Sequence, residues 1–299
     1  MRARSLRLAG IPGRGLRFDN SKKNPASDPD TPWEPAVPAQ QLVSSAEGPD
    51  EAPVLVLGNP IGTARDVWSQ QVPVLSRYFR VIRYEHRGHG APGAQSPAPK
   101  GPYTIAELGA DVLATLNGHG IERFAFAGVS LGGMTGLWLA ANAPERITSL
   151  AVLCAALTPL PDAQSWHDRA ALVRTQGMPA LAGAAVPRWF TPAFMAREPD
   201  RVETVAGMLK ATSPEGYAGC AEAIAALDLR PLLPSVKAPT LVLSGAEDVA
   251  APPSAGAYTA RNVPGARLTV VPGAAHFAHY EKPGPVTDAL LAHFQATLG

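Results

Sequence analysis

A serine flanked by glycines lies near the middle of the sequence, at Gly128-Val129-Ser130-Leu131-Gly132. An apolar run ends at this point, and the helix-like spacing of apolar residues begins at once. A nucleophilic serine on a sharp strand-to-helix turn needs this context, because only small neighbours let strand and helix approach while the hydroxyl projects. An ordinary small-residue loop is the alternative. We interpret Ser130 as a candidate nucleophile.

A serine hydroxyl needs a general base, and the base needs an acid that orients it. One known arrangement places them along the chain in the order serine, acid, histidine. The segment SGAEDVAAPP offers Glu247 and Asp248, and PGAAHFAHYEKP offers His276 and His279. We favour Asp248, which leads into a proline-containing turn, and His276, which follows small residues. The other acid is then a solvated charge, and His279 is expected to begin the next segment or to face solvent.

Several apolar runs have the length and composition of buried strands. They cover residues 52–58, 81–84, 123–129, 147–155, 239–245 and 267–273. A helix is expected after the Thr104/Glu107 capping box, ending at Gly118, and two more over 131–143 and from Pro285 onward. Strands that alternate with helices predict an α/β fold with a mostly parallel sheet covered on both faces. Such sheets bind ligands at the carboxyl ends of their strands.

The alternation breaks between about residues 158 and 236, where helical patches, prolines and aromatic residues occur. We predict a helical cap inserted over the strand ends. Its aromatic residues Trp166, Trp189 and Phe190 are expected to line a substrate pocket, with packing inside the cap as the alternative for each. The predicted organisation is a basic, proline-rich arm over 1–39, an α/β core over 40–157 and 237–299, and a cap over 158–236.

The composition excludes several classes of partner. The net charge of +1 in 299 residues provides no general attraction to nucleic acid or to an anionic membrane surface. No apolar run approaches the length of a membrane span. The basic N-terminus lacks the apolar stretch of a secretory signal, so we expect a cytoplasmic protein. The sequence does not indicate an oligomeric state.

Cysteine and histidine give little sign of a metal centre. Cys154 and Cys220 are the two cysteines, and both lie in or beside apolar stretches, so we expect reduced and buried thiols. His86 and His89 stand beside Glu85, but no further ligand has suitable spacing, and RGHG is typical of a turn. We predict no metal and no cofactor.

Longer motifs carry a family resemblance. The segments GPDEAPVLVLGNPIGT, VIRYEHRGHGAP, GPYTIAELGADVLATL, GVSLGGMTGLWLAANAPERI, RWFTPAF, SPEGYAGC and GAEDVAAPP resemble the 3-oxoadipate enol-lactonases of the α/β-hydrolase superfamily. The match runs from about residue 46 to the C-terminus. The resemblance implies an α/β-hydrolase fold with a helical cap, and a serine esterase or lactonase that needs no cofactor. Ser130, Asp248 and His276 fall on the family's nucleophile, acid and base.

The sequence departs from that family after the fourth strand and at the N-terminus. Enol-lactonases typically have a CNTAARIG-like segment, whose arginine suits a substrate carboxylate, whereas this chain has CAALTPLPD. Loss of such a charge-assisted contact weakens acid binding by about 1.5 to 3 kcal/mol. We therefore predict a preference for a neutral lactone or ester. A preference for the acid would require another cation, such as Arg169 or Arg188. The long N-terminal arm is also unlike the family.

The oxyanion hole is a further point of departure. Leu131 N–H begins the predicted helix and can bind a developing oxyanion. In this superfamily the loop after the first core strand supplies the second N–H, and the usual donor falls on Pro60 in LGNPIGT. Proline has no N–H. We expect Ile61 N–H to donate instead, because Gly62 lets the loop adjust.

Three functional hypotheses follow from these residues. The first is hydrolysis of an ester or lactone of a small, largely apolar molecule through an acyl-serine intermediate. The second is a non-hydrolytic enzyme on the same scaffold, such as an acyltransferase, a cyclase or a C–C lyase. The third is a ligand-binding or structural protein with a vestigial site. The serine, acid and histidine occur in the expected order, which favours an enzyme over the third hypothesis.

Overall fold

The computed structural model describes residues 38–298. The predicted arm over 1–39 lies outside the described residues except for its last two. The described chain builds a seven-stranded sheet in the order β1-β3-β2-β4-β5-β6-β7. β1 pairs with β3 in antiparallel fashion, and the other neighbouring pairs are parallel. The strands are β1 (Ser44–Glu47), β2 (Val54–Gly58), β3 (Arg80–Tyr84), β4 (Phe124–Val129), β5 (Ile147–Leu153), β6 (Thr240–Gly245) and β7 (Arg267–Val271).

The central strands form where the sequence is continuously apolar. Every residue of β4 and β6 is buried, and Leu55, Val56 and Leu57 of β2 have no exposed surface. A strand that is buried on both faces needs such a composition. All six predicted strands are present, but β7, at the edge of the sheet, exposes four of its five residues and is not a buried strand. β1 was not predicted, because its four residues SSAE carry no apolar pattern.

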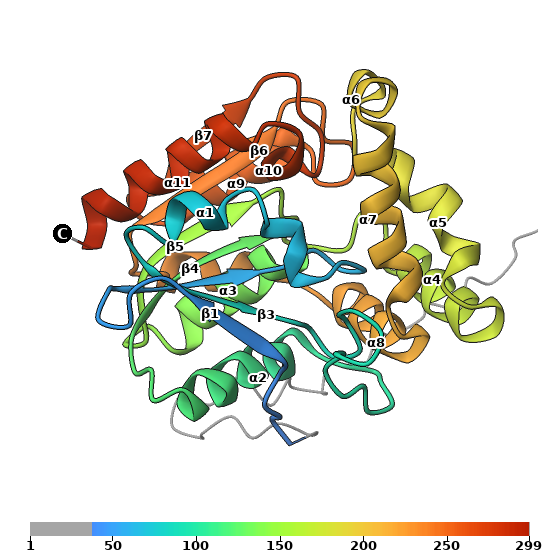
Figure 1. Ribbon diagram of the computed structural model, residues 1–299, viewed down its shortest axis with the longest axis horizontal. Coiled ribbons are helices and arrows are strands. Elements are labelled where there is room, and N and C mark those ends of the chain that lie inside the picture. Colours follow the sequence, from blue (N-terminus) through green and yellow to red (C-terminus); the bar gives the residue numbers. More distant parts are fainter. Residues whose placement is uncertain (1–37, 299) are drawn as a thin grey trace, which may run out of the picture. The chain divides into compact units, whose positions relative to one another are not determined.

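Helices cover both faces of the sheet. α1 (Val72–Leu75) packs against α11 (Pro283–Leu298), and α2 (Ile105–Gly118) packs against α3 (Leu131–Asn142) on the opposite face (Figure 1). α9 (Pro253–Asn262) packs against β6 and β7. Two short elements complete the core, η2 (Arg65–Trp68) and α10 (Ala278–Glu281). The predicted α/β-hydrolase architecture is thus confirmed.

Local sequence signals explain where two of these helices begin. At α2 the Glu107 N–H donates to Thr104 Oγ1 at 3.2 Å, and Thr104 N–H donates to Glu107 Oε2 at 2.8 Å. This reciprocal pair is the predicted capping box. α11 begins at Pro283, two residues before the predicted Pro285, because proline is tolerated throughout the first turn of a helix.

The chain between β5 and β6 consists of helices that gather beside the sheet (Figure 1). We interpret this segment as the predicted cap, whose boundaries at 158 and 236 stay a prediction. Its elements are α4 (Ala163–Gln176), α5 (Pro179–Ala185), η3 (Val186–Arg188), α6 (Pro192–Arg197), α7 (Pro199–Ala211), α8 (Pro214–Ala225) and η4 (Arg230–Ser235).

Two other expectations concern the chain as a whole. Cys154 and Cys220 are free thiols and both are buried, as predicted. Within residues 38–298, no helix has both the length and the apolar character to cross a membrane.

Candidate active site

Ser130 occupies the tight turn between β4 and α3. Its backbone has φ 52° and ψ −115°, a left-handed conformation that is rare outside glycine, and the turn is held by a Ser130 N–H bond to Leu153 O at 2.9 Å. The flanking glycines make the turn possible. A Cβ on Gly128 would lie 2.2 Å from the Gly132 carbonyl carbon, and one on Gly132 would lie 2.3 Å from Gly58 O. The strained turn makes the Ser130 hydroxyl project away from the backbone at the end of β4.

Asp248 and His276 meet above the ends of β6 and β7. His276 Nδ1 lies 2.9 Å from Asp248 Oδ2, and Oδ1 of the same carboxylate accepts bonds of 2.8 Å from the Ala250 and Ala251 N–H groups. Because a carboxylate accepts, Nδ1 carries the proton, which leaves the Nε2 lone pair free to accept another. Asp248 is 3% exposed and His276 6% exposed, so the pair is shielded from water.

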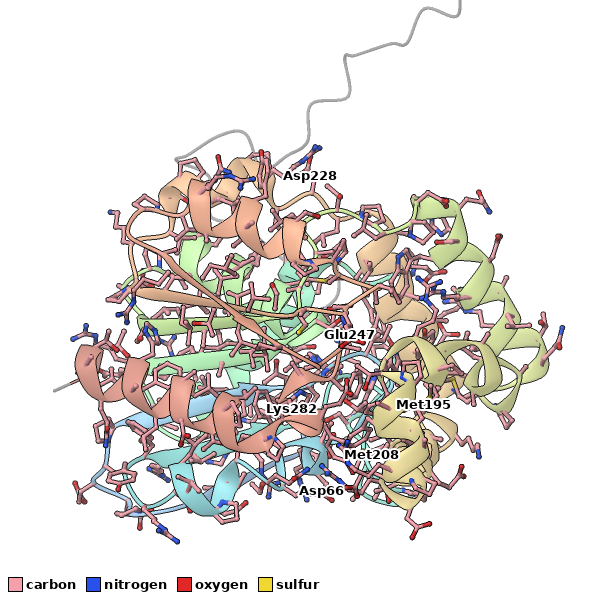
Figure 2. All side chains as sticks on the ribbon, turned by 90° about the horizontal axis from the view of Figure 1, so that it is seen from above. Asp66, Met195, Met208, Asp228, Glu247 and Lys282 are labelled. Atoms are coloured by element: carbon pink, nitrogen blue, oxygen red, sulfur yellow. The ribbon has the colours of Figure 1, made fainter. Side chains whose placement is uncertain are left out.

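The two alternative residues lie elsewhere. Glu247 is exposed, two residues after the end of β6 (Figure 2). His279 lies in α10 and is fully buried, with its ring centroid 4.8 Å from that of Trp68. Of the two expectations for His279, the structure agrees with the first, that it begins the next segment, and not with the second, that it faces solvent. The sequence did not reveal the burial of His279, because this residue lies in a four-residue helix. Such a helix is too short for its buried face to be read from the spacing of apolar residues.

One pocket brings Ser130 and His276 together. Its wall combines core residues with residues from the cap, and it includes Trp166 and Trp189. Phe190 is not part of this wall. It stacks on Phe194 at 5.3 Å and also contacts Phe277, so the structure gives it the packing role that was the alternative. The wall also contains Met134, Leu160, Ala156 and Tyr217.

Two cations share the wall of this pocket. Arg169, from α4, lies with its guanidinium carbon 4.3 Å from the centre of the Trp166 ring and shares the pocket wall with Tyr217. Arg188 ends η3. Within the described chain neither arginine forms an ion pair, and no described residue of the pocket wall carries a carboxylate.

Two backbone N–H groups near the serine have no intramolecular partner among the described residues. Leu131 N–H is the first of α3, and Ile61 N–H belongs to the loop after β2. Ile61 lines the pocket, whereas Pro60 has no N–H to offer. The next N–H of the loop, that of Gly62, donates to His89 Nε2 at 2.9 Å and is not available. This arrangement supports the predicted choice of Ile61 over Pro60.

Glu281, which the sequence did not single out, links the cap to the loop that carries His276. Its Oε2 accepts bonds from Thr191 N–H at 3.1 Å and Thr191 Oγ1 at 2.7 Å, and its Oε1 accepts from Ala275 N–H at 2.7 Å. Ala275 immediately precedes His276. Nothing in the local segment HYEKP marks this glutamate, because its partners lie six and 90 residues away.

His86 and His89 are buried in the loop after β3, with 1% and 0% exposure. No group of three or more His, Cys, Asp or Glu side chains within residues 38–298 is arranged to hold a metal ion. Both histidines instead contact the backbone of the loop that follows β2.

Comparison with known proteins defines the class to which this chain belongs. The family model for the alpha/beta hydrolase fold matches residues 53–283, so the chain belongs to this family. It is 39% identical to 3-oxoadipate enol-lactonase 2 of Acinetobacter baylyi over 245 residues, which is 82% of this chain and 90% of that protein. The protein is thus a hydrolase close to the 3-oxoadipate enol-lactonases.

Solved structures agree with this assignment. The enol-lactonase from Burkholderia xenovorans LB400 superposes with a TM-score of 0.82 and 41% identity, covering 85% of this chain and 96% of that chain. A thermophilic esterase from Thermogutta terrifontis with bound malate has a TM-score of 0.80 and 28% identity, covering 86% and 93%.

Proposed function

We propose that the protein hydrolyses an ester or lactone of a small molecule through an acyl-serine intermediate. One observation carries the proposal. A serine on a strained turn shares a pocket with a histidine whose Nδ1 is bonded to a buried carboxylate at 2.9 Å. Ser130 is the nucleophile, His276 the general base and Asp248 the orienting acid. Leu131 and Ile61 supply the N–H donors for the oxyanion.

The reaction proceeds in two halves. Ser130 Oγ attacks the carbonyl carbon while His276 Nε2 takes the hydroxyl proton, and the tetrahedral oxyanion accepts bonds from the two N–H groups. The C–O bond to the leaving oxygen then breaks, and the imidazolium returns the proton to that oxygen. A water molecule, deprotonated by the same imidazole, attacks the acyl-serine. The bond from the acyl carbon to Ser130 Oγ breaks, the imidazolium returns its proton to Oγ, and the acid is released. For a lactone, the leaving hydroxyl stays attached to the acyl chain.

The pocket wall supports a substrate that combines apolar groups with an acid. Most lining residues are apolar or aromatic, but Arg169 and Arg188 stand among them without acidic partners. An unpaired guanidinium in a pocket is suited to a carboxylate, which it can bind in a bidentate manner. These arginines weigh against the neutral substrate that CAALTPLPD alone predicts. The enol-lactonase relatives and the malate bound to the related esterase favour the same conclusion.

Substitution of the three proposed catalytic residues tests the mechanism. Ser130→Ala, Asp248→Asn and His276→Ala should each lower kcat by at least about 10³, because each disables the same unit. Glu247→Gln removes the neighbouring exposed carboxylate and should leave kcat near the wild-type value. Full activity of His276→Ala together with loss in His279→Ala would overturn the assignment.

A substrate panel tests the reaction class. Lactones and short aryl esters, each with and without a carboxylate, should be hydrolysed, with water as the acceptor of the acyl group. The kcat/KM should be higher for the carboxylated members. Reaction with a fluorophosphonate should label Ser130. A chain that labels but transfers its acyl group only to another acceptor would be an acyltransferase, and the hydrolase proposal would fail.

A further inference from the structure

The loop that carries the candidate oxyanion donor Ile61 rests on His89. Gly62 N–H donates to His89 Nε2 at 2.9 Å, and His89 Nδ1 lies 2.8 Å from Arg87 O. A carbonyl oxygen only accepts, so Nδ1 carries the proton and Nε2 offers its lone pair to Gly62. The imidazole must therefore be neutral. Complete burial favours this state, because it lowers the pKa of His89 to about 4.

His86 supports the other end of the same loop. Its Nε2 donates to Asn59 O at 3.0 Å, since that carbonyl can only accept. The same oxygen accepts a 3.0 Å bond from Gly132 N–H, in the first turn of α3. Asn59 thus joins the loop to the helix whose first N–H, on Leu131, is the other candidate donor. The rings of His86 and His89 lie 5.7 Å apart in an edge-to-face arrangement.

These bonds select which N–H of the loop is free. Pro60 has no donor, and the Gly62 donor is occupied by His89. Ile61 N–H, between them, is left for the pocket. Its position relative to Leu131 N–H is fixed by the two bonds that meet at Asn59 O.

We propose that His89, assisted by His86, is a positioning residue that holds the Ile61 N–H at the oxyanion. This inference rests on the proposed acyl-serine mechanism. Neither histidine touches the substrate. Their effect is to keep the loop in the geometry that gives a second donor in spite of Pro60. If His89 has this role, replacing it should weaken binding of the transition state without weakening binding of the substrate in its ground state.

Variants of His89 test the proposal. His89→Leu removes the acceptor, and we expect kcat to fall by about 10²-fold, the effect of losing one oxyanion donor, while KM changes by less than about threefold. Affinity for a trifluoromethyl ketone, which forms a tetrahedral adduct on Ser130, should fall in proportion to kcat/KM. His89→Gln, whose amide oxygen can accept from Gly62 N–H, should recover at least tenfold of the lost kcat.

His293→Leu is the matched control. His293 is also buried and hydrogen-bonded, to Ser149 and Leu150 O, but it belongs to α11 outside the site. The His293→Leu substitution should lower the free energy of unfolding and leave kcat unchanged. A folded His89→Leu whose kcat is that of the wild type, or falls no further than in His293→Leu, would overturn the proposal.

A measurement on the wild-type protein keeps the test independent of substrate and of variant folding. Nitrogen-15 NMR should detect scalar coupling between Gly62 N and His89 Nε2 across the hydrogen bond, and its absence would contradict the proposal. Failure of the proposed function has a different signature, a wild type that neither labels with fluorophosphonate nor turns over. Equal labelling rates in wild type and His89→Leu would refute the positioning role alone.

Discussion

At the scale of single residues, the role of each side chain in and near the pocket depends on the groups that it contacts. The Asp248 carboxylate accepts three bonds and is held in place, whereas Glu247, one residue earlier, is exposed. Arg188 has no acidic partner in the described chain, so its charge is available to a ligand. Arg169 is already engaged with Trp166 and Tyr217, so its removal also disturbs packing.

Substitution of Arg188 should therefore change substrate preference. Arg188→Met is expected to lower kcat/KM for a carboxylated lactone or ester by about 10- to 150-fold, the effect of losing a charge-assisted bond worth about 1.5 to 3 kcal/mol. The neutral isostere should change by less than about threefold. Arg197→Met, on the exposed surface of α6, is the control and should affect neither substrate. Equal losses on both substrates would contradict a role in recognising the acid.

At the scale of elements, β2, β4 and α3 approach so closely that glycine is required between them. A Cβ on Gly128 would lie 2.2 Å from a backbone atom, and one on Gly132 would lie 2.3 Å from another. Backbone atoms cannot move aside as a flexible side chain can. The same close contact brings Asn59 O to the first turn of α3. The strained serine turn is thus a product of strand–helix packing and of the loop above it.

Substitution of glycine in two helices should have opposite effects. Gly132→Ala is expected to lower the free energy of unfolding by about 3 kcal/mol or more, because its Cβ would lie 2.3 Å from Gly58 O. Gly207→Ala in α7 meets nothing within 4 Å and should raise the stability by about 0.5 to 1 kcal/mol through helix propensity. Urea denaturation of both variants measures these changes. A Gly132→Ala protein as stable as Gly207→Ala would contradict the packing argument.

At the scale of the whole molecule, burial of histidine couples stability to pH. Desolvation lowers the pKa of His86 to about 3, of His89 to about 4 and of His279 to about 3, against an ordinary value of 6.5. As pH falls below 6.5, the unfolded chain binds protons that the folded chain does not, so the free energy of unfolding decreases. Glu85 acts in the opposite direction between about pH 7 and 4.5, because burial raises its pKa to about 7.

The histidines should outweigh the glutamate. Each histidine removes about 2 kcal/mol of stability by pH 5, and Glu85 returns about 2, so a net loss of about 4 kcal/mol is expected between pH 7.5 and 5.0. Urea denaturation at the two pH values checks this. His279→Leu, which leaves the loop of Ile61 untouched, should reduce the loss by about 2 kcal/mol. A stability that is the same at both pH values would contradict the buried neutral histidines.

Sequence patterns predicted the parts of this molecule that follow local rules. Continuous apolar runs marked the central strands, and the Ser130 turn was visible because steric demand restricts its neighbours to glycine. Features that depend on distant partners were not predictable. Glu281 acquires its role from Thr191, and His89 from Gly62, and neither pair has a fixed spacing. Phe190 was assigned to the pocket because an aromatic residue gives the same signal in a wall or in a packed interior.

The carboxylate of Glu281 has a consequence for protein engineering. One of its oxygens holds Thr191 at the cap and the other holds Ala275, beside His276, the proposed general base. The inserted helices are therefore not an interchangeable module, even though they enter and leave the core between two adjacent strands. A chimera that takes this segment from a relative must bring a hydroxyl at the position of Thr191. Without it, Glu281 Oε2 keeps only the backbone N–H of that position, and the loop of His276 is held less firmly on the side of the graft.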